Sequence, residues 1–74
     1  MSIEEKIRDI LAENGVGIDV EGRLVDVNSM SFIATIVGIE SEFSIEFPDE
    51  FLRVGNFDKV DDFVRVVTYV MSTK

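Results

Sequence analysis

The chain has 74 residues, 15 of them acidic and 7 basic, which gives a net charge of −8 at neutral pH. This charge argues against nucleic acid as a partner, because the phosphates would be repelled, and it favours partners with basic surfaces. On charge alone, however, the stronger explanation for the acidic composition is that it improves solubility. The sequence contains no cysteine and no histidine, which excludes a disulfide, a thiolate metal site, a thiol nucleophile and the usual general base.

The length also limits the architecture. We expect one small domain spanning residues 1–74, and the hydrophobic content of 46% is sufficient for one core. The sequence shows neither a signal peptide nor an apolar run long enough to cross a membrane. The default expectation is therefore a monomeric cytoplasmic protein without membrane contact.

A first helix is predicted from Ile3 to Asn14. Ser2 and Glu5 have the spacing of a capping box, and Asn14-Gly15 is typical of a helix end at which the backbone becomes left-handed. The apolar residues recur at helical spacing and predict one core face: Ile3, Ile7, Ile10 and Leu11. This helix is interpreted as purely structural.

A long connection is predicted from Val16 to Asn28, with Gly17 and Gly22 as bends. Its apolar residues are too frequent for a free linker, and some should hold it against the bundle: Ile18, Val20, Leu24, Val25 and Val27. Its acidic residues, among them Asp19 and Glu21, lack the alternating ligands and the distal bidentate Glu of an EF-hand. No metal site is therefore predicted.

A second helix is predicted from Ser29 to Phe43. At 100° per residue, a narrow arc forms its core face: Phe32, Ile36, Ile39 and Phe43. The opposite side carries few charges for a surface helix, and we interpret it as a docking strip for partner proteins, made of Met30, Ile33, Ala34, Val37, Glu40 and Ser41. Two alternatives stay open: a helix buried on all sides, or exposed apolar residues without a role.

Gly38 lies inside this second helix, where a glycine costs about 1 kcal/mol relative to alanine. A close approach by the connection between residues 16 and 27, or by a partner protein, would explain its presence. The sequence does not distinguish these two explanations.

Residues 44–57 are predicted to be irregular. Pro48 is tolerated in a first helical turn, and the acidic pair Asp49-Glu50 suits the dipole of that turn. The residues that follow predict a short third helix or turn made of Phe51, Leu52 and Val54, with Gly55-Asn56 at its end.

A last helix is predicted from about Lys59 to Ser72. Asp58 is expected to cap it, and Asp61 and Asp62 suit its first turn. Its β-branched residues would favour a strand, but the apolar spacing indicates a helix with a core face of Val60, Phe63, Val64, Val67, Val70 and Met71. The predicted fold class is all-α: a small four-helix bundle with three main helices and a short third one.

Ser29 stands where the second helix begins. A helix start offers unpaired N–H groups and partial positive charge, which suit a phosphate attached at this serine. Taken alone, the residue would be an ordinary cap or first-turn serine. A hydrolytic role is excluded, because there is no histidine and no Gly-x-Ser-x-Gly motif.

The segment around Ser29 resembles the prosthetic-group segment of the acyl and peptidyl carrier proteins. Those proteins have Asp-Ser-Leu at this helix start, a Glu-rich helix end with Phe, and then Ile-x-hydrophobic-Pro-Asp. The matching residues are Asn28-Ser29-Met30, Glu40-Ser41-Glu42-Phe43 and Ile45-Glu46-Phe47-Pro48-Asp49. The resemblance covers nearly the whole chain. It implies an acyl-carrier-protein-like fold in which Ser29, flanked by Asn28 and Met30, carries 4′-phosphopantetheine added from coenzyme A by a phosphopantetheinyl transferase.

The resemblance further implies a carrier without catalysis of its own. Acyl or aminoacyl intermediates would travel as thioesters on Ser29 between loading and downstream biosynthetic enzymes with basic docking surfaces. Ser31 and Ala34 stand where fatty-acid carriers often place acids, which favours a specialised or secondary pathway, including stand-alone aminoacyl carriers. The alternative from another class is a small acidic helical adaptor that binds a basic partner and is never modified.

Overall fold

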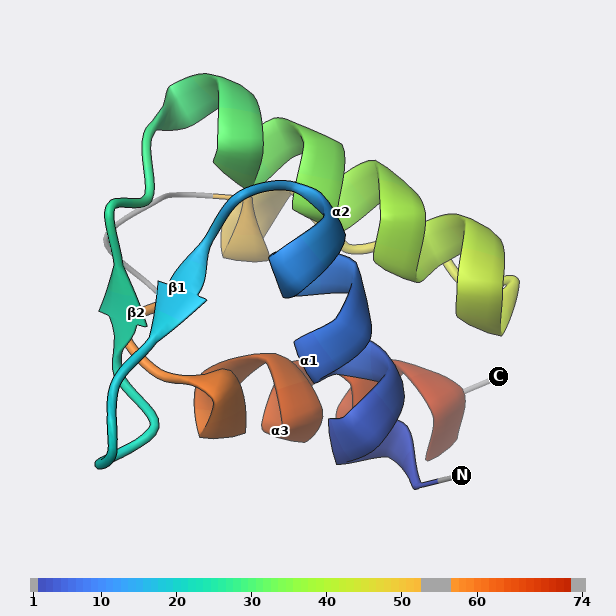
Figure 1. Cartoon of the computed structure of the whole chain (residues 1–74). Helices are drawn as coiled ribbons and strands as arrows, with labels where there is room; N and C mark the ends of the chain where they lie inside the picture. The colour runs from blue at the N-terminus through green and yellow to red at the C-terminus, as the bar shows by residue number, and fades with distance from the viewer. Residues whose placement is uncertain (1, 53–56, 73–74) are drawn as a thin grey trace.

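The structure, a computed structural model, describes residues 2–52 and 57–72 (Figure 1). Its elements in chain order are α1 (Ile3–Glu13), β1 (Gly17–Ile18), β2 (Leu24–Val25), α2 (Ser29–Phe43), the 3₁₀ helix η1 (Asp49–Phe51) and α3 (Val60–Ser72). The predicted small helical bundle is confirmed, with α1 packed against both α2 and α3. None of the described helices is long and apolar enough to cross a lipid bilayer.

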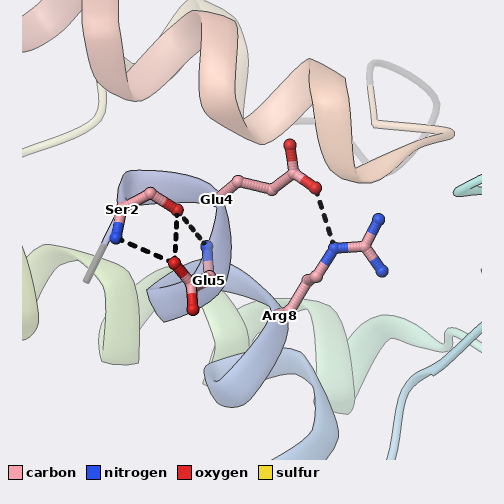
Figure 2. Close-up of polar contacts among 4 residues, drawn as sticks. All are labelled: Ser2, Glu4, Glu5 and Arg8. Carbon is pink, nitrogen blue, oxygen red and sulfur yellow. Dashed lines mark hydrogen bonds and ion pairs between the residues drawn. The ribbon is translucent and has the colours of Figure 1, made fainter.

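α1 begins where the sequence predicts and ends one residue earlier than predicted. The Ser2 hydroxyl accepts a hydrogen bond from the Glu5 backbone N–H at 3.1 Å, and the Glu5 carboxylate accepts one from the Ser2 backbone N–H at 3.3 Å (Figure 2). The helix stops at Glu13, and Gly15 follows with a φ of +78°, which a glycine adopts without steric cost. Its predicted core residues are buried at Ile7, Ile10 and Leu11 and half-buried at Ile3.

The connection between α1 and α2 is more ordered than predicted, because it contains a small antiparallel hairpin. β1 pairs with β2 in the register Gly17↔Val25 and Ile18↔Leu24. The Asp19 carboxylate closes the turn by accepting hydrogen bonds from the backbone N–H groups of Glu21 and Arg23, both at 2.9 Å. Asp19 therefore has a structural role in this turn.

The hairpin is also joined to the start of α3, far away in the sequence. The Leu24 N–H donates to the Asp58 carbonyl at 3.0 Å, and the Val60 N–H donates to the Gly22 carbonyl at 2.9 Å. These bonds satisfy backbone groups in the same way as a sheet ladder. They fix the hairpin, which precedes Ser29 in the chain, to the start of α3.

Four aromatic rings lie together among the aliphatic side chains of the core. Phe57 stacks on Phe63 with ring centroids 4.4 Å apart, and Phe32 and Phe47 contact Phe57 at centroid distances of 5.5 and 6.3 Å. All four rings are buried. Phe43, which was predicted on the core face of the second helix, lies half-buried at the edge of the core, as does Phe51.

The close approach inferred at Gly38 comes from α1, and the connection proposed for it is not the neighbour. A Cβ atom at Gly38 would lie 2.9 Å from Cγ2 of Ile10, a separation at which one of the two residues must move. α1 and α2 therefore pack at this point with no space for a side chain on α2.

Within residues 44–52 the segment after α2 forms the 3₁₀ turn η1, preceded by Pro48 with a φ of −60°. The predicted continuation through Val54, Gly55 and Asn56 lies outside the described residues. α3 begins at Val60, one residue later than predicted. At its start the Asp62 carboxylate accepts hydrogen bonds from the backbone N–H groups of Asp58 and Lys59, at 2.8 and 3.0 Å.

Candidate functional site

The start of α2 is held by a reciprocal pair of hydrogen bonds. The Asn28 side-chain oxygen accepts from the Ser31 N–H at 2.9 Å, and the Ser31 hydroxyl oxygen accepts from the Asn28 N–H, also at 2.9 Å. Asn28 is thus the cap, and Ser29 is the first residue of the helix. The role of Ser31 was not predicted from the sequence, although the Asn-x-x-Ser spacing is that of a capping box.

The Ser29 side chain lies exposed at this helix start. Its hydroxyl makes no hydrogen bond to another described residue, whereas the Ser31 hydroxyl two positions later both accepts from the Asn28 N–H and donates to the Asn28 carbonyl. Ser29 is therefore available for modification in a way that Ser31 is not.

The backbone around Ser29 offers donors for an anion. The N–H of Ser31 is taken by the Asn28 side chain, and that of Phe32 by the Asn28 carbonyl at 2.8 Å. Within residues 2–52 and 57–72 the N–H groups of Ser29 and Met30 have no acceptor. A phosphate attached to the Ser29 oxygen would thus find free donors and the positive end of the helix dipole. These residues fit a phosphate ester.

The residues expected to form the docking strip lie on the outer side of α2, apart from Glu40. Met30, Ile33 and Val37 are 83%, 60% and 58% exposed. Ala34 and Ser41 are exposed as well. The helix is thus not buried on all sides, which removes one of the two alternatives to a docking strip.

Glu40 has a different environment from the other five residues. It is half-buried, and its carboxylate accepts a hydrogen bond from the Phe47 N–H at 2.9 Å. The Ile45 N–H donates to the Glu40 carbonyl at 3.1 Å. Glu40 therefore holds the chain that turns back from α2 and directs Phe47 into the core. Residue spacing alone could not reveal this contact, because the partner is a backbone group seven positions further on.

Titratable groups near the start of α2 do not form a reactive cluster. Among the described residues no group of three or more acidic side chains is arranged to hold a metal ion.

The pKa of the Asp62 carboxyl group, in α3, departs clearly from its ordinary range. Its partial burial would raise the pKa, but hydrogen bonds from the Asp58 N–H, the Arg65 side chain and the Lys59 N–H, with the charge of Arg65, lower it overall.

The sequence is similar to that of a known carrier protein. The chain is 32% identical over 65 residues to aminoacyl carrier protein 1 of Bradyrhizobium diazoefficiens, a match that covers 82% of this chain and 72% of that protein. The chain belongs to the acyl and peptidyl carrier protein family. No family profile and no solved structure matches this carrier protein.

The start of α2 lies within the part of the chain that matches the relative. The aligned share of the chain is large enough to include the hairpin, α2 and most of the bundle. Within it, a single exposed serine stands at the first position of α2 with two free N–H groups beside it.

Proposed function

We propose that this protein is a phosphopantetheine-dependent carrier in which Ser29 is the attachment site and Asn28 and Met30 border the attached phosphate. The observation that carries this proposal is the exposed Ser29 hydroxyl at the first position of α2, beside free N–H groups of Ser29 and Met30. Family membership supports the same role.

The residues of the chain position the attachment, and the attached group supplies the chemistry. When bound, 4′-phosphopantetheine provides the thiol that a chain without cysteine lacks, and this thiol holds the cargo as a thioester. Asn28 and Ser31 fix the first turn, so that the Ser29 oxygen and the free N–H groups keep one geometry. The protein then delivers cargo to separate enzymes and performs no catalysis itself.

We propose an aminoacyl or short acyl group as the cargo, within a specialised biosynthetic pathway. The relative from Bradyrhizobium diazoefficiens is named as an aminoacyl carrier. The interior of this chain is occupied by the packed rings of Phe32, Phe47, Phe57 and Phe63. A long acyl chain would have to displace these rings, because close-packed cores leave few voids.

The proposed docking strip consists of Met30, Ile33, Ala34, Val37 and Ser41, with Glu40 now assigned to the fold. No charged side chain lies on α2 between Ser29 and Ile39. A phosphopantetheinyl transferase and the loading and downstream enzymes would meet this strip with apolar side chains. The net charge of −8 elsewhere favours basic residues around that contact. The protein would act as a monomer in the cytoplasm.

The deciding experiment is incubation with a broad-specificity phosphopantetheinyl transferase and coenzyme A, read by intact-protein mass. A carrier gains the mass of one phosphopantetheine group. A chain that stays at its original mass, while a known carrier protein in the same tube is converted, is an unmodified acidic adaptor instead.

A further inference from the structure

The link between β2 and α2 is short: β2 ends at Val25, and α2 begins at Ser29 (Figure 1). Within this link Asp26 has a φ of +61°. A Cβ atom is crowded in this left-handed conformation, which Asp and Asn tolerate better than most residues and β-branched residues tolerate least. A residue held in such a conformation is a reason to look for a functional cause.

The side chain of Asp26 does not account for this conformation. The residue is exposed, and its carboxylate makes no hydrogen bond or ion pair with another described residue. Asp26 therefore contributes its backbone conformation, which sets the direction in which the chain leaves β2 and approaches α2.

On the hairpin side of Asp26 the chain is held from two directions. Val25 pairs with Gly17 of β1. The neighbouring Leu24 N–H donates to the Asp58 carbonyl at 3.0 Å, which joins the same strand to the start of α3. β2 is thus bonded along both of its edges and resists a change of direction.

On the helix side of Asp26 fewer contacts hold the chain. Val27 is half-buried against the core, and Asn28 caps α2 through two hydrogen bonds with Ser31 at the protein surface, both 2.9 Å long. These contacts fix the helix start and, with it, the Ser29 hydroxyl. When residue 26 cannot adopt the left-handed conformation, the side with fewer contacts moves, and that side carries Ser29.

We propose that Asp26 is a positioning residue for the modification of Ser29 and acts through its left-handed backbone, not through its carboxylate. The inference rests on the proposed function, in which coenzyme A is the donor. The Ser29 oxygen bonds to the phosphorus that bears the pantetheine, and the P–O bond of the diphosphate breaks. Adenosine 3′,5′-bisphosphate leaves with the electron pair, and the hydroxyl proton goes to a base of the transferase. The rate of this attack depends on where the Ser29 oxygen is held.

The test measures kcat and KM for modification by a broad-specificity phosphopantetheinyl transferase with coenzyme A, at a temperature where circular dichroism shows every variant folded. Asp26→Asn and Asp26→Gly keep the left-handed backbone accessible and should match the wild type within about twofold. Asp26→Val should lower kcat by about tenfold or more with little change in KM, because the docking strip is intact. The control is Glu21→Val, which makes the same change of charge at an exposed residue without a positive φ and should behave as the wild type.

Amide hydrogen exchange separates a shifted helix start from a general loss of stability. In Asp26→Val the Ser31 N–H, which donates to Asn28, should exchange several-fold faster, while amides in the middle of α1 and α3 keep their wild-type rates. Asp26→Ala has a Cβ atom without a branch; its kcat should fall severalfold, and it replaces Asp26→Val if that variant does not fold.

A wild-type kcat in the folded Asp26→Val or Asp26→Ala protein overturns the inference. So does a low kcat in Asp26→Asn, which would assign the effect to the carboxylate. A wild-type chain that gains no mass refutes the proposed function, whereas mass addition at equal rates in all variants refutes this inference alone.

Discussion

Gly38 of α2 lies directly against Ile10 of α1: a Cβ atom at position 38 would stand 2.9 Å from the Cγ2 atom of Ile10. The glycine thus sets how closely the two helices pack. Gly38 lies on the same helix as Ser29 but on its inner side. The position of the proposed docking strip, on the outer side of α2, therefore depends on a helix contact that only glycine permits.

Replacement of Gly38 by alanine should lower the free energy of unfolding by about 1 kcal/mol, measured by chemical denaturation. Alanine gains about 1 kcal/mol of helix propensity, but overpacking costs roughly 1–3 kcal/mol. Ile10→Leu, which removes the branch at Cβ, should recover part of the loss when combined with Gly38→Ala. A Gly38→Ala protein that is more stable than the wild type would contradict the close approach.

A buried hydroxyl group in α2 predicts a stabilising change. Thr35 is 0% exposed, and its Oγ1 atom has no hydrogen-bond partner among the described residues. A buried polar group without a partner costs about 1–3 kcal/mol, so Thr35→Val should raise the free energy of unfolding by about 1 kcal/mol. Thr35→Ser keeps the hydroxyl and loses the methyl group, and should lower it. Reduced stability in Thr35→Val would show that the hydroxyl does have a partner.

Asp62 predicts a specific dependence of stability on pH. Hydrogen bonds and Arg65 hold its pKa below the ordinary 3.8 in the folded chain. The ionised carboxylate therefore stabilises the fold above the unfolded-state pKa, and this contribution is lost as the pH falls through the lower folded-state pKa. Asp62→Asn should be less stable than the wild type at pH 6, and the difference should shrink below about pH 4.

The matched control is Asp61→Asn, because the Asp61 side chain is 73% exposed and pairs with Arg65 only at 3.6 Å. Denaturation curves at several pH values should show a much smaller and less pH-dependent effect for this variant. A constant difference between wild type and Asp62→Asn down to pH 2 would contradict the lowered pKa.

The docking strip is tested by a charge at Val37. Since Val37 is 58% exposed, Val37→Glu should change the free energy of unfolding by only about 0.5–1 kcal/mol. Modification by the transferase should nevertheless slow at least several-fold, because a charge would be buried without a partner at the interface. Val20→Glu makes the same change at a fully exposed position of the hairpin turn and should be modified at the wild-type rate. Equal modification rates for Val37→Glu and Val20→Glu would contradict the docking role of the strip.

The helices were predictable because each depends on local signals. Ser2 with Glu5 marks the start of α1, and the spacing of Phe32, Ile36 and Ile39 marks the inner face of α2. The hairpin was missed because β1 and β2 have two residues each, too few for any periodicity. Its stability comes from distant groups instead, through the bond from the Leu24 N–H to the Asp58 carbonyl.

In the candidate site too, residues marked by local signals were predictable and residues that depend on distant contacts were not. Ser29 could be singled out from Asn28-Ser29-Met30 and the spacing to Pro48, since these signals lie in one segment. Glu40 was assigned to the docking strip from its helical position, because only the folded chain shows that its carboxylate binds the Phe47 N–H. A residue on the outer half of a helix can thus serve the interior when the following loop folds back over it.

The central claim is that the Ser29 hydroxyl, and not another serine, carries the prosthetic group. The most direct measurement is peptide mapping by mass spectrometry after transferase treatment of the wild type, Ser29→Ala and Ser31→Ala. We predict one modified site at Ser29 in the wild type and in Ser31→Ala, and none in Ser29→Ala, with the helical circular dichroism of Ser29→Ala unchanged because Asn28 remains the cap. Modification at Ser31 or Ser41, or continued modification of Ser29→Ala, would contradict the account.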